Sequence, residues 1–288
     1  LMSFEILEKD LEKLIDIALN EDLGSSNLDA TSSAIISDNT IISANIVNRN
    51  PCRIAGLKIV EKVFKIVDEK LICTSNFKDK DDVSSNTNIL KVHGRAKSIL
   101  LAERTVLNLF QRMCSIATTT NKFVQVAQRP DLLILDTRKT TPGLRLIEKM
   151  AVSMGGGVNH RMGLYDAIMI KDNHLSIWES YEGKGINEAV TTARNKFPKL
   201  KIQIEVDQIN QLKTVLNAKP DWILLDNMSV KDLKKSVILC RDICKTEASG
   251  GINLDTIKRI SATGVDAVSI GALTHSPEFI DLGLDFTL

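Results

Sequence analysis

The spacing of apolar and polar positions along this chain changes near residue 115. Before this residue, segments with helical spacing of apolar residues and segments typical of strands predict a mixed α/β region. Its expected helices begin after the candidate N-cap Ser3, near 56–67 and over 97–114, and its expected strands cover 40–48, 70–77 and 88–95. A further helix is expected over 116–128.

After residue 130, short apolar runs typical of buried strands alternate with helical patterns. The runs cover 132–136, 167–171, 201–206, 222–226, 245–248 and 267–271. The helical patterns cover 185–197, 208–218, 229–243 and 253–263. This alternation predicts parallel βαβ units, which either close into a barrel or form an open doubly wound sheet.

The residues that follow the strands favour the barrel. Each run ends in polar residues or glycine: Asp136-Thr137-Arg138-Lys139, Lys171-Asp172-Asn173, Glu205, Asp226-Asn227, Ser249-Gly250-Gly251 and Gly271. In βα barrels the chemistry lies at the carboxyl ends of the strands, so these groups are expected around one mouth. Six units in place of eight predict an incomplete barrel.

The stretch from Asp136 to His174 is the richest in candidate chemistry. It holds two of the four histidines together with Arg138, Lys139, Arg145, Arg161 and Lys171. Such a cluster suits a small ligand with several carboxylates or phosphates, because guanidinium groups bind them bidentately. A solvated basic surface is the alternative, but the basic residues alternate with apolar runs and form no lysine tract.

Composition narrows the classes of function. The chain has 288 residues, with 43% hydrophobic and 25% charged residues, as in ordinary globular proteins. A formal net charge of +1 argues against nucleic acid as a partner. Five cysteines indicate a reducing compartment, and no apolar run approaches the length of a membrane span. A cytoplasmic enzyme with no membrane partner is therefore expected.

Several segments together resemble one family, quinolinate phosphoribosyltransferase, also called carboxylating nicotinate-nucleotide pyrophosphorylase. The matching segments are Glu103-Arg104-Thr105 with Leu107-Asn108, 136–145, 155–166, 170–174, Glu205-Val206, Leu225-Asp226-Asn227, 247–251 and 264–276. The resemblance is weakest before residue 96, where 25–29 departs from the family's form.

The resemblance implies a fold and a reaction. The fold is an N-terminal α/β sandwich domain over 1–115 and a six-stranded, incomplete α/β barrel over 116–288 that carries the active site, with the last residues packing on the N-terminal domain. The reaction joins quinolinate and 5-phosphoribosyl 1-pyrophosphate in NAD biosynthesis, with Mg²⁺ as cofactor. It yields nicotinate mononucleotide, pyrophosphate and carbon dioxide, in a homodimer with shared active sites.

The resemblance also implies a role for each site residue. Quinolinate binds to Thr137, Arg138, His160, Arg161, Lys171 and Arg104 of the partner subunit. The phosphoribosyl donor binds to Lys139, Glu205, Asp226, Ser249, Gly250, Gly251, Gly271, Ala272 and His275. Lys139, Lys171, Glu205 and Asp226 are the expected catalytic residues, and Glu205 and Asp226 hold Mg²⁺ directly or through water.

Other interpretations of these residues remain open. Lys171 at a strand end also suits a Schiff-base lysine, and Glu205 and Asp226 suit simple ion pairs with lysine. Arg104 lies between Leu100 and Leu107 on an apolar stripe, so it either extends to the edge or reaches an anionic ligand or partner. A related enzyme with another aromatic acid, or a non-catalytic phosphosugar-binding protein, is the rival function.

Overall fold

The structure, a computed structural model, describes residues 4–287 of the chain, and the predicted N-cap Ser3 lies outside that range. The chain divides into two compact units that interleave along the sequence. The first contains residues up to 121, 140–156 and those from 276 onward, and the second contains 122–139 and 157–275. The domain boundary at residue 115 stays a prediction.

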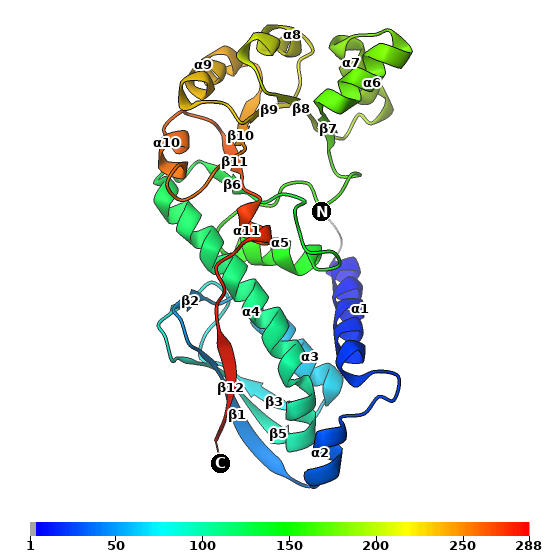
Figure 1. Cartoon of the computed structure of the whole chain (residues 1–288), viewed down its shortest axis with the longest axis vertical. Helices are drawn as coiled ribbons and strands as arrows, with labels where there is room; N and C mark the ends of the chain where they lie inside the picture. Colours follow the sequence, from blue (N-terminus) through cyan, green and yellow to red (C-terminus); the bar gives the residue numbers. More distant parts are fainter. Residues whose placement is uncertain (1–3, 288) are drawn as a thin grey trace. The chain divides into compact units, whose positions relative to one another are not determined.

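The first unit is built around an antiparallel sheet with the strand order β12-β1-β5-β3. Its strands are β1 (Ile41–Asn48), β3 (Ile72–Thr74), β5 (Asn88–Arg95) and β12 (Leu282–Thr287), and a two-stranded ribbon joins β2 (Cys52–Arg53) to β4 (Asp82–Val83). The helices α1 (Phe4–Leu23), α2 (Ala30–Ile35) and α3 (Leu57–Val67) belong to the same unit. β12 lies beside β1, with Ser43 opposite Thr287, although the sequence pattern had not predicted this strand (Figure 1).

The two helices predicted over 97–114 and 116–128 are one continuous helix, α4 (Ala96–Ala127), so that prediction was wrong. Polar residues in its middle bind the chain's last segment. The Ser115 hydroxyl accepts a hydrogen bond from the Ile280 N–H at 2.9 Å, and the Thr119 hydroxyl accepts one from the Glu278 N–H at 3.1 Å. The helix α5 (Arg145–Met154) was not predicted, and its buried Glu148 pairs with Arg112 of α4 at 2.7 Å.

The second unit contains a parallel sheet with the order β6-β11-β10-β9-β8-β7. The strands are β6 (Leu133–Leu135), β7 (Ile168–Ile170), β8 (Ile202–Val206), β9 (Trp222–Asp226), β10 (Lys245–Ser249) and β11 (Ala267–Ser269). From β7 to β11 the neighbours follow chain order, as in a barrel, whereas a doubly wound sheet reverses direction. β6 and β7 form the two edges, so the predicted incomplete six-stranded barrel is confirmed.

The helices between these strands mostly match the predicted ranges. They are α6 (Asp172–Glu182), α7 (Ile186–Lys196), the 3₁₀ turn Ile209–Gln211 with α8 (Leu212–Asn217), α9 (Val230–Cys240), α10 (Ile257–Ser261) and α11 (Ala272–His275). α9 begins where the Ser229 side chain accepts a hydrogen bond from the Asp232 N–H, which satisfies one end-group of the helix. α6 was not predicted.

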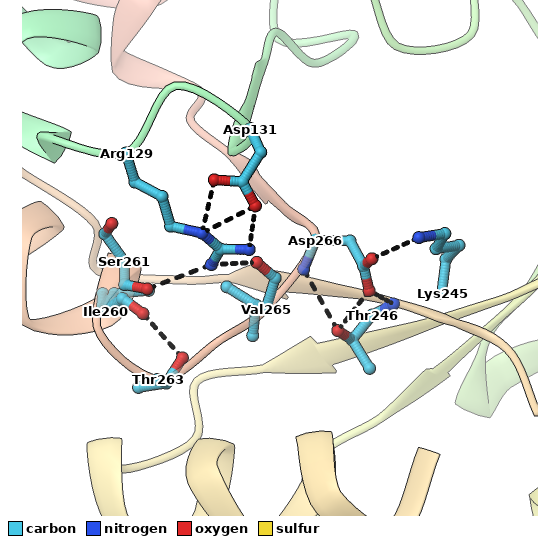
Figure 2. A network of polar contacts seen from close by, with 9 residues as sticks. All are labelled: Arg129, Asp131, Lys245, Thr246, Ile260, Ser261, Thr263, Val265 and Asp266. Carbon is cyan, nitrogen blue, oxygen red and sulfur yellow. Dashed lines mark hydrogen bonds and ion pairs between the residues drawn. The ribbon is translucent and has the colours of Figure 1, made fainter. Parts of the chain in front are cut away.

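A polar network fixes the amino-terminal ends of three strands (Figure 2). The Asp266 carboxylate accepts hydrogen bonds from the backbone and hydroxyl of Thr246, each at 2.9 Å, and from Lys245 at 2.7 Å. Nearby, Arg129 pairs with Asp131 at 2.9 Å and donates to the Val265 carbonyl at 2.6 Å. These contacts hold the starts of β6, β10 and β11 together.

Across the described residues 4–287, no helix combines the length and apolar character that crossing a membrane requires.

Candidate active site

A pocket of about 740 Å³ lies at the carboxyl-terminal ends of the strands of the second unit. The residues predicted for the site line it, with the exception of Arg104: Thr137, Arg138, Lys139, His160, Arg161, Lys171, Glu205, Asp226, Ser249, Gly250, Gly251, Gly271, Ala272 and His275. The structure therefore brings together side chains that come from all six strand ends.

The end of β6 is tied to the loop that follows α5. Asp136 is fully buried, and its carboxylate accepts hydrogen bonds from the Asn159 side chain at 2.7 Å and the His160 N–H at 2.8 Å. Leu135 also pairs with Val158 in an isolated bridge. The Asp136 carboxylate is thus hydrogen-bonded within the protein. The residues of this segment that line the pocket are the three that follow it, Thr137, Arg138 and Lys139.

Two guanidinium groups, those of Arg138 and Arg161, line this pocket, and the Asp166 carboxylate offsets part of the charge of Arg161. Arg161 donates to the Ala167 carbonyl at 3.2 Å and contacts the Met169 sulfur at 3.6 Å. Its pKa is lowered, first by burial and then by the positive charge of Arg138. Like charges held close are unfavourable unless an anion lies between them. The pair is therefore suited to a ligand with more than one carboxylate.

Lys171 and Glu205 form the ion pair that the sequence left open. Lys171 Nζ lies 2.5 Å from Glu205 Oε2, and the two side chains come from the ends of β7 and β8. Asp226, at the end of β9, accepts a hydrogen bond from the Asn227 side chain at 2.7 Å. The carboxylates of Glu205 and Asp226 both line the pocket, so the pocket contains acidic as well as basic side chains.

Glycines let other groups approach the pocket closely at two strand ends. A Cβ at Gly250 would overlap with Oδ1 of Asn227, and Gly250 has a φ of 90° that favours glycine. A Cβ at Gly271 would lie 2.9 Å from Lys139 Cδ and 3.1 Å from His275 Cδ2. Gly271 thus leaves room for the aliphatic stem of Lys139 to cross it.

Arg104 does not line the pocket. It lies on α4 in the first unit, and its side chain is exposed, so the expected place on an apolar stripe was wrong. An exposed side chain agrees with both open alternatives, an arginine that extends to the edge of the helix and one that reaches an anionic ligand or partner. Its role in an active site stays a prediction.

Sequence reasoning assigned no role to several residues of the pocket wall, among them Glu247, Met169 and Ser269. Glu247 lies inside β10 and is 1% exposed. A carboxylate at an interior position of the predicted strand 245–248 was the available signal. Glu247 lies inside its strand and not after it, so the strand-end pattern did not include it.

Comparison with known proteins agrees with this geometry. The family model "Quinolinate phosphoribosyl transferase, C-terminal domain" matches residues 116–285, and the N-terminal domain model of the same family matches 29–114. The chain is 39% identical over 279 residues to "Probable nicotinate-nucleotide pyrophosphorylase [carboxylating]" of Bacillus subtilis (strain 168), with 96% of this chain and 94% of that protein covered. It is 37% identical over 294 residues to "Quinolinate phosphoribosyltransferase [decarboxylating] 1b" of Nicotiana tabacum, with 96% and 82% covered.

A solved structure of the nicotinate-nucleotide pyrophosphorylase from Francisella tularensis superposes with a TM-score of 0.90 at 35% identity. The match covers 97% of this chain and 96% of that one. The chain thus belongs to the quinolinate phosphoribosyl transferase family.

Proposed function

We propose that this protein transfers the 5-phosphoribosyl group of 5-phosphoribosyl 1-pyrophosphate to quinolinate and decarboxylates the adduct. The products are nicotinate mononucleotide, pyrophosphate and carbon dioxide, which is a step of NAD biosynthesis. The observation that carries the proposal is the pair of guanidinium groups, Arg138 and Arg161, that line one pocket and repel each other. Quinolinate brings two adjacent carboxylates that such a pair would bind.

The transfer needs positioning and charge stabilisation more than proton removal. The pyridine nitrogen already has a lone pair, so it attacks the ribosyl carbon without a general base. Glu205 is held by Lys171 in an ion pair, which suits a carboxylate that binds ribose hydroxyls. Lys139 crosses Gly271 beside His275, and its ammonium group would neutralise the departing pyrophosphate.

The decarboxylation that follows uses charge made in the first step. Once the nitrogen is ribosylated, the ring is a pyridinium, and its positive charge stabilises the carbanion left when carbon dioxide departs. A proton from solvent then adds to that ring carbon and gives nicotinate mononucleotide. Arg138 and Arg161 would keep the ring in place through the carboxylate that remains.

Glu205 and Asp226 fit the proposed Mg²⁺. Magnesium is commonly held by one or two carboxylates together with substrate phosphates, and these two carboxylates lie on neighbouring strands. Within the described residues, no group of three or more His, Cys, Asp or Glu side chains could hold a metal alone, so the donor's phosphates would complete the site. When bound, Mg²⁺ would neutralise charge on the pyrophosphate group.

The assignment of the carboxylates can be tested by calorimetry. Glu205→Ala and Asp226→Ala should weaken binding of the phosphoribosyl donor with Mg²⁺ and leave quinolinate binding largely intact, because a carboxylate repels a dicarboxylate. Loss of quinolinate binding alone would reverse the assignment.

We also propose a homodimer in which Arg104 reaches the partner's active site, and a cytoplasmic location. The exposed position of Arg104 on α4 supports the first idea. Arg104→Ala and Lys139→Ala subunits should each be nearly inactive as homodimers. A mixture allowed to exchange subunits should regain activity, and confirmed exchange without recovery would count against a shared site.

The direct test of function is an assay. The protein is incubated with quinolinate, 5-phosphoribosyl 1-pyrophosphate and Mg²⁺, and nicotinate mononucleotide and pyrophosphate are measured. A non-catalytic phosphosugar-binding protein would bind the donor without releasing pyrophosphate. An enzyme for another aromatic acid would turn over nicotinate or a related ring acid in preference to quinolinate.

A further inference from the structure

Two of the five cysteines lie close together at the amino-terminal end of the parallel sheet. Cys240 is the last residue of α9, and Cys244 directly precedes β10. The Cys240 carbonyl accepts hydrogen bonds from the backbone N–H groups of Ile243 at 3.0 Å and of Cys244 at 3.2 Å. Asp242, with a φ of 63°, lies within this tight turn. The turn brings the two thiols into hydrogen-bonding contact.

The two thiols differ in exposure. Cys240 is 1% exposed, whereas Cys244 is half-buried. Both line a pocket of about 1170 Å³ whose wall also includes the apolar side chains of Val237, Ile238 and Ile243. A small uncharged molecule that enters this pocket can therefore reach the Cys244 sulfur, and the Cys240 sulfur lies in contact with it.

The contact between the thiols also gives them different reactivity. It raises the pKa of Cys240, and burial acts in the same direction. It lowers the pKa of Cys244, against the opposing effects of burial and of the negative charge of Asp266. The thiolate is the reactive form of cysteine. Cys244 is thus the nucleophile of the pair, and Cys240 is the protonated thiol that donates a hydrogen bond to it.

Each of the other three cysteines lacks one of these features. Cys52 and Cys114 are also hydrogen-bonded to each other, but they are only 4% and 0% exposed. Cys73 is half-buried like Cys244, but burial raises its pKa to about 11, and its contacts include no second thiol. All five cysteines lie in the described part of the chain, and among them the Cys240–Cys244 pair alone combines thiol contact with access.

We propose that Cys240 and Cys244 form an oxidation site that reacts with hydrogen peroxide and closes to a disulfide. The pair has the division of roles of a redox dithiol, with an accessible nucleophile and a buried resolving thiol. The disulfide would link the end of α9 to the start of β10. This proposal is independent of the reaction at the active site.

The oxidation has two steps. The Cys244 thiolate attacks one peroxide oxygen, so that an S–O bond forms, the O–O bond breaks and hydroxide leaves. The peroxide is reduced, and Cys244 becomes a sulfenic acid. Cys240 then gives its proton to hydroxide, and its sulfur attacks Cys244 Sγ, so that the S–S bond forms as the S–O bond breaks. The second hydroxide takes a proton from solvent. Two thiols and one peroxide thus yield one disulfide and two waters.

Trypsin cleaves between the two cysteines, after Arg241, so the disulfide can be identified directly. Reduced protein, freed of reductant, is treated with hydrogen peroxide at neutral pH, unfolded in urea with iodoacetamide and digested for mass spectrometry. The expected product is a linked pair of the peptides 236–241 and 242–245, which dithiothreitol separates. Recovery of the two peptides without a link would overturn the proposal.

The rate of oxidation provides a second measurement, for which Cys73 is the matched control. Cys73 has similar exposure but a higher pKa, so it has the smaller thiolate fraction at neutral pH. A less basic thiolate is also a weaker nucleophile, which offsets part of this difference, so Cys244 should be oxidised about tenfold faster or more. Cys73→Ser should leave the yield of the linked peptides unchanged. Equal rates at the two cysteines would contradict a dedicated site.

Cys240→Ser separates the two steps. A serine hydroxyl can still donate a hydrogen bond to the Cys244 sulfur but cannot form a disulfide, so Cys244 should stop at the sulfenic acid, which dimedone captures. In Cys244→Ser, Cys240 should yield no dimedone adduct, because its thiol is buried. An adduct at Cys240 would contradict the assigned roles. If neither variant folds, the wild-type linked peptides and the rate relative to Cys73 still decide.

Discussion

Charged side chains at the two ends of the six-stranded sheet differ in whether they are paired within the protein. At the amino-terminal end, Asp266 binds Lys245 and Thr246, and Arg129 binds Asp131 (Figure 2). At the carboxyl-terminal end, Arg138 and Arg161 line one pocket and repel each other. The first end neutralises its charges within the fold, whereas at the second end Lys171 pairs with Glu205 but the two guanidinium groups leave positive charge for a ligand.

The pKa shifts follow the same division. Burial raises the pKa of Asp266, but the contacts with Lys245 and Thr246 outweigh it and the pKa is lowered. Burial likewise disfavours the charged form of Arg161, and there the charge of Arg138 adds to the effect. Charge at the first end therefore stabilises the fold, whereas charge at the second is unfavourable until an anion binds. The stability of the fold should therefore depend on the amino-terminal end of the sheet, and the activity on the carboxyl-terminal end.

The largest effect is expected for Arg161→Lys. An ammonium cannot reproduce the planar fork that binds carboxylates, so kcat/KM for quinolinate should fall about 100-fold, which corresponds to about 2.7 kcal/mol. The melting temperature should stay the same or rise, because a desolvated cation is replaced by a more adaptable one. Steady-state kinetics and thermal denaturation check this. A drop in stability that parallels the loss of activity would remove the contrast between the two ends.

Substrate choice should show the next largest effect. Nicotinate carries one carboxylate, so it would leave one of the two guanidinium groups without an ionic partner. A hydrogen bond to a charged group contributes about 1.5–3 kcal/mol, so nicotinate should be used about ten- to a hundredfold less efficiently than quinolinate. Competition between the two acids in one assay measures the ratio directly. Comparable efficiencies would mean that the arginine pair is not a dicarboxylate site.

A smaller effect, on stability alone, is expected for Asp266→Ala. The change leaves the backbone and hydroxyl of Thr246 without their acceptor, so the free energy of unfolding should fall by about 2 kcal/mol. kcat/KM should stay within about twofold. Urea denaturation and the standard assay measure the two quantities.

The effect of Asp266→Ala should also depend on pH. A carboxylate whose pKa is lowered on folding stabilises the fold above its unfolded pKa of about 3.9, and this contribution is lost as the pH falls through the folded pKa. The difference between wild type and variant should accordingly be full at neutral pH and shrink below about pH 4. A difference that is constant from neutral to strongly acidic pH would exclude an ionic origin.

The smallest effect is expected for Lys245→Ala. Its side chain is 64% exposed, and exposed ion pairs contribute about 0–1 kcal/mol. Both activity and stability should therefore be nearly unchanged. Lys171→Ala is the matched change at the other end, since Lys171 also pairs with a carboxylate, and it should abolish most activity. Similar behaviour of the two lysines would contradict the division of roles.

The pocket was predictable from sequence because its residues share a position. Parallel strands bring their carboxyl ends to one edge, so the groups that follow each apolar run meet there, as Lys171 and Glu205 do. Glu247 breaks this rule, because it lies within β10 and reaches the pocket through the pleat of the strand. Which face a strand residue occupies depends on register, and short apolar runs do not fix the register.

The fold shows the same limit. The middle of α4 looked like a junction because Ser115 and Thr119 are polar, but both are satisfied by the backbone of residues 278 and 280. These hydrogen bonds join residues more than 150 positions apart in the sequence. The local spacing of apolar and polar residues therefore cannot predict them. Arg104 was misplaced for a related reason, since two leucines do not define how far an apolar face extends around a helix.

The pairing of β12 with β1 has a consequence for how the protein is made. The first sheet needs a strand from residues 282–287, so a nascent chain emerging from the ribosome cannot complete its first unit until these residues are translated. All of the second unit is synthesised in between. Contacts of such long sequence separation close slowly. Until they close, the free side of β1 is an unpaired strand edge, the kind of surface that chaperones protect from aggregation.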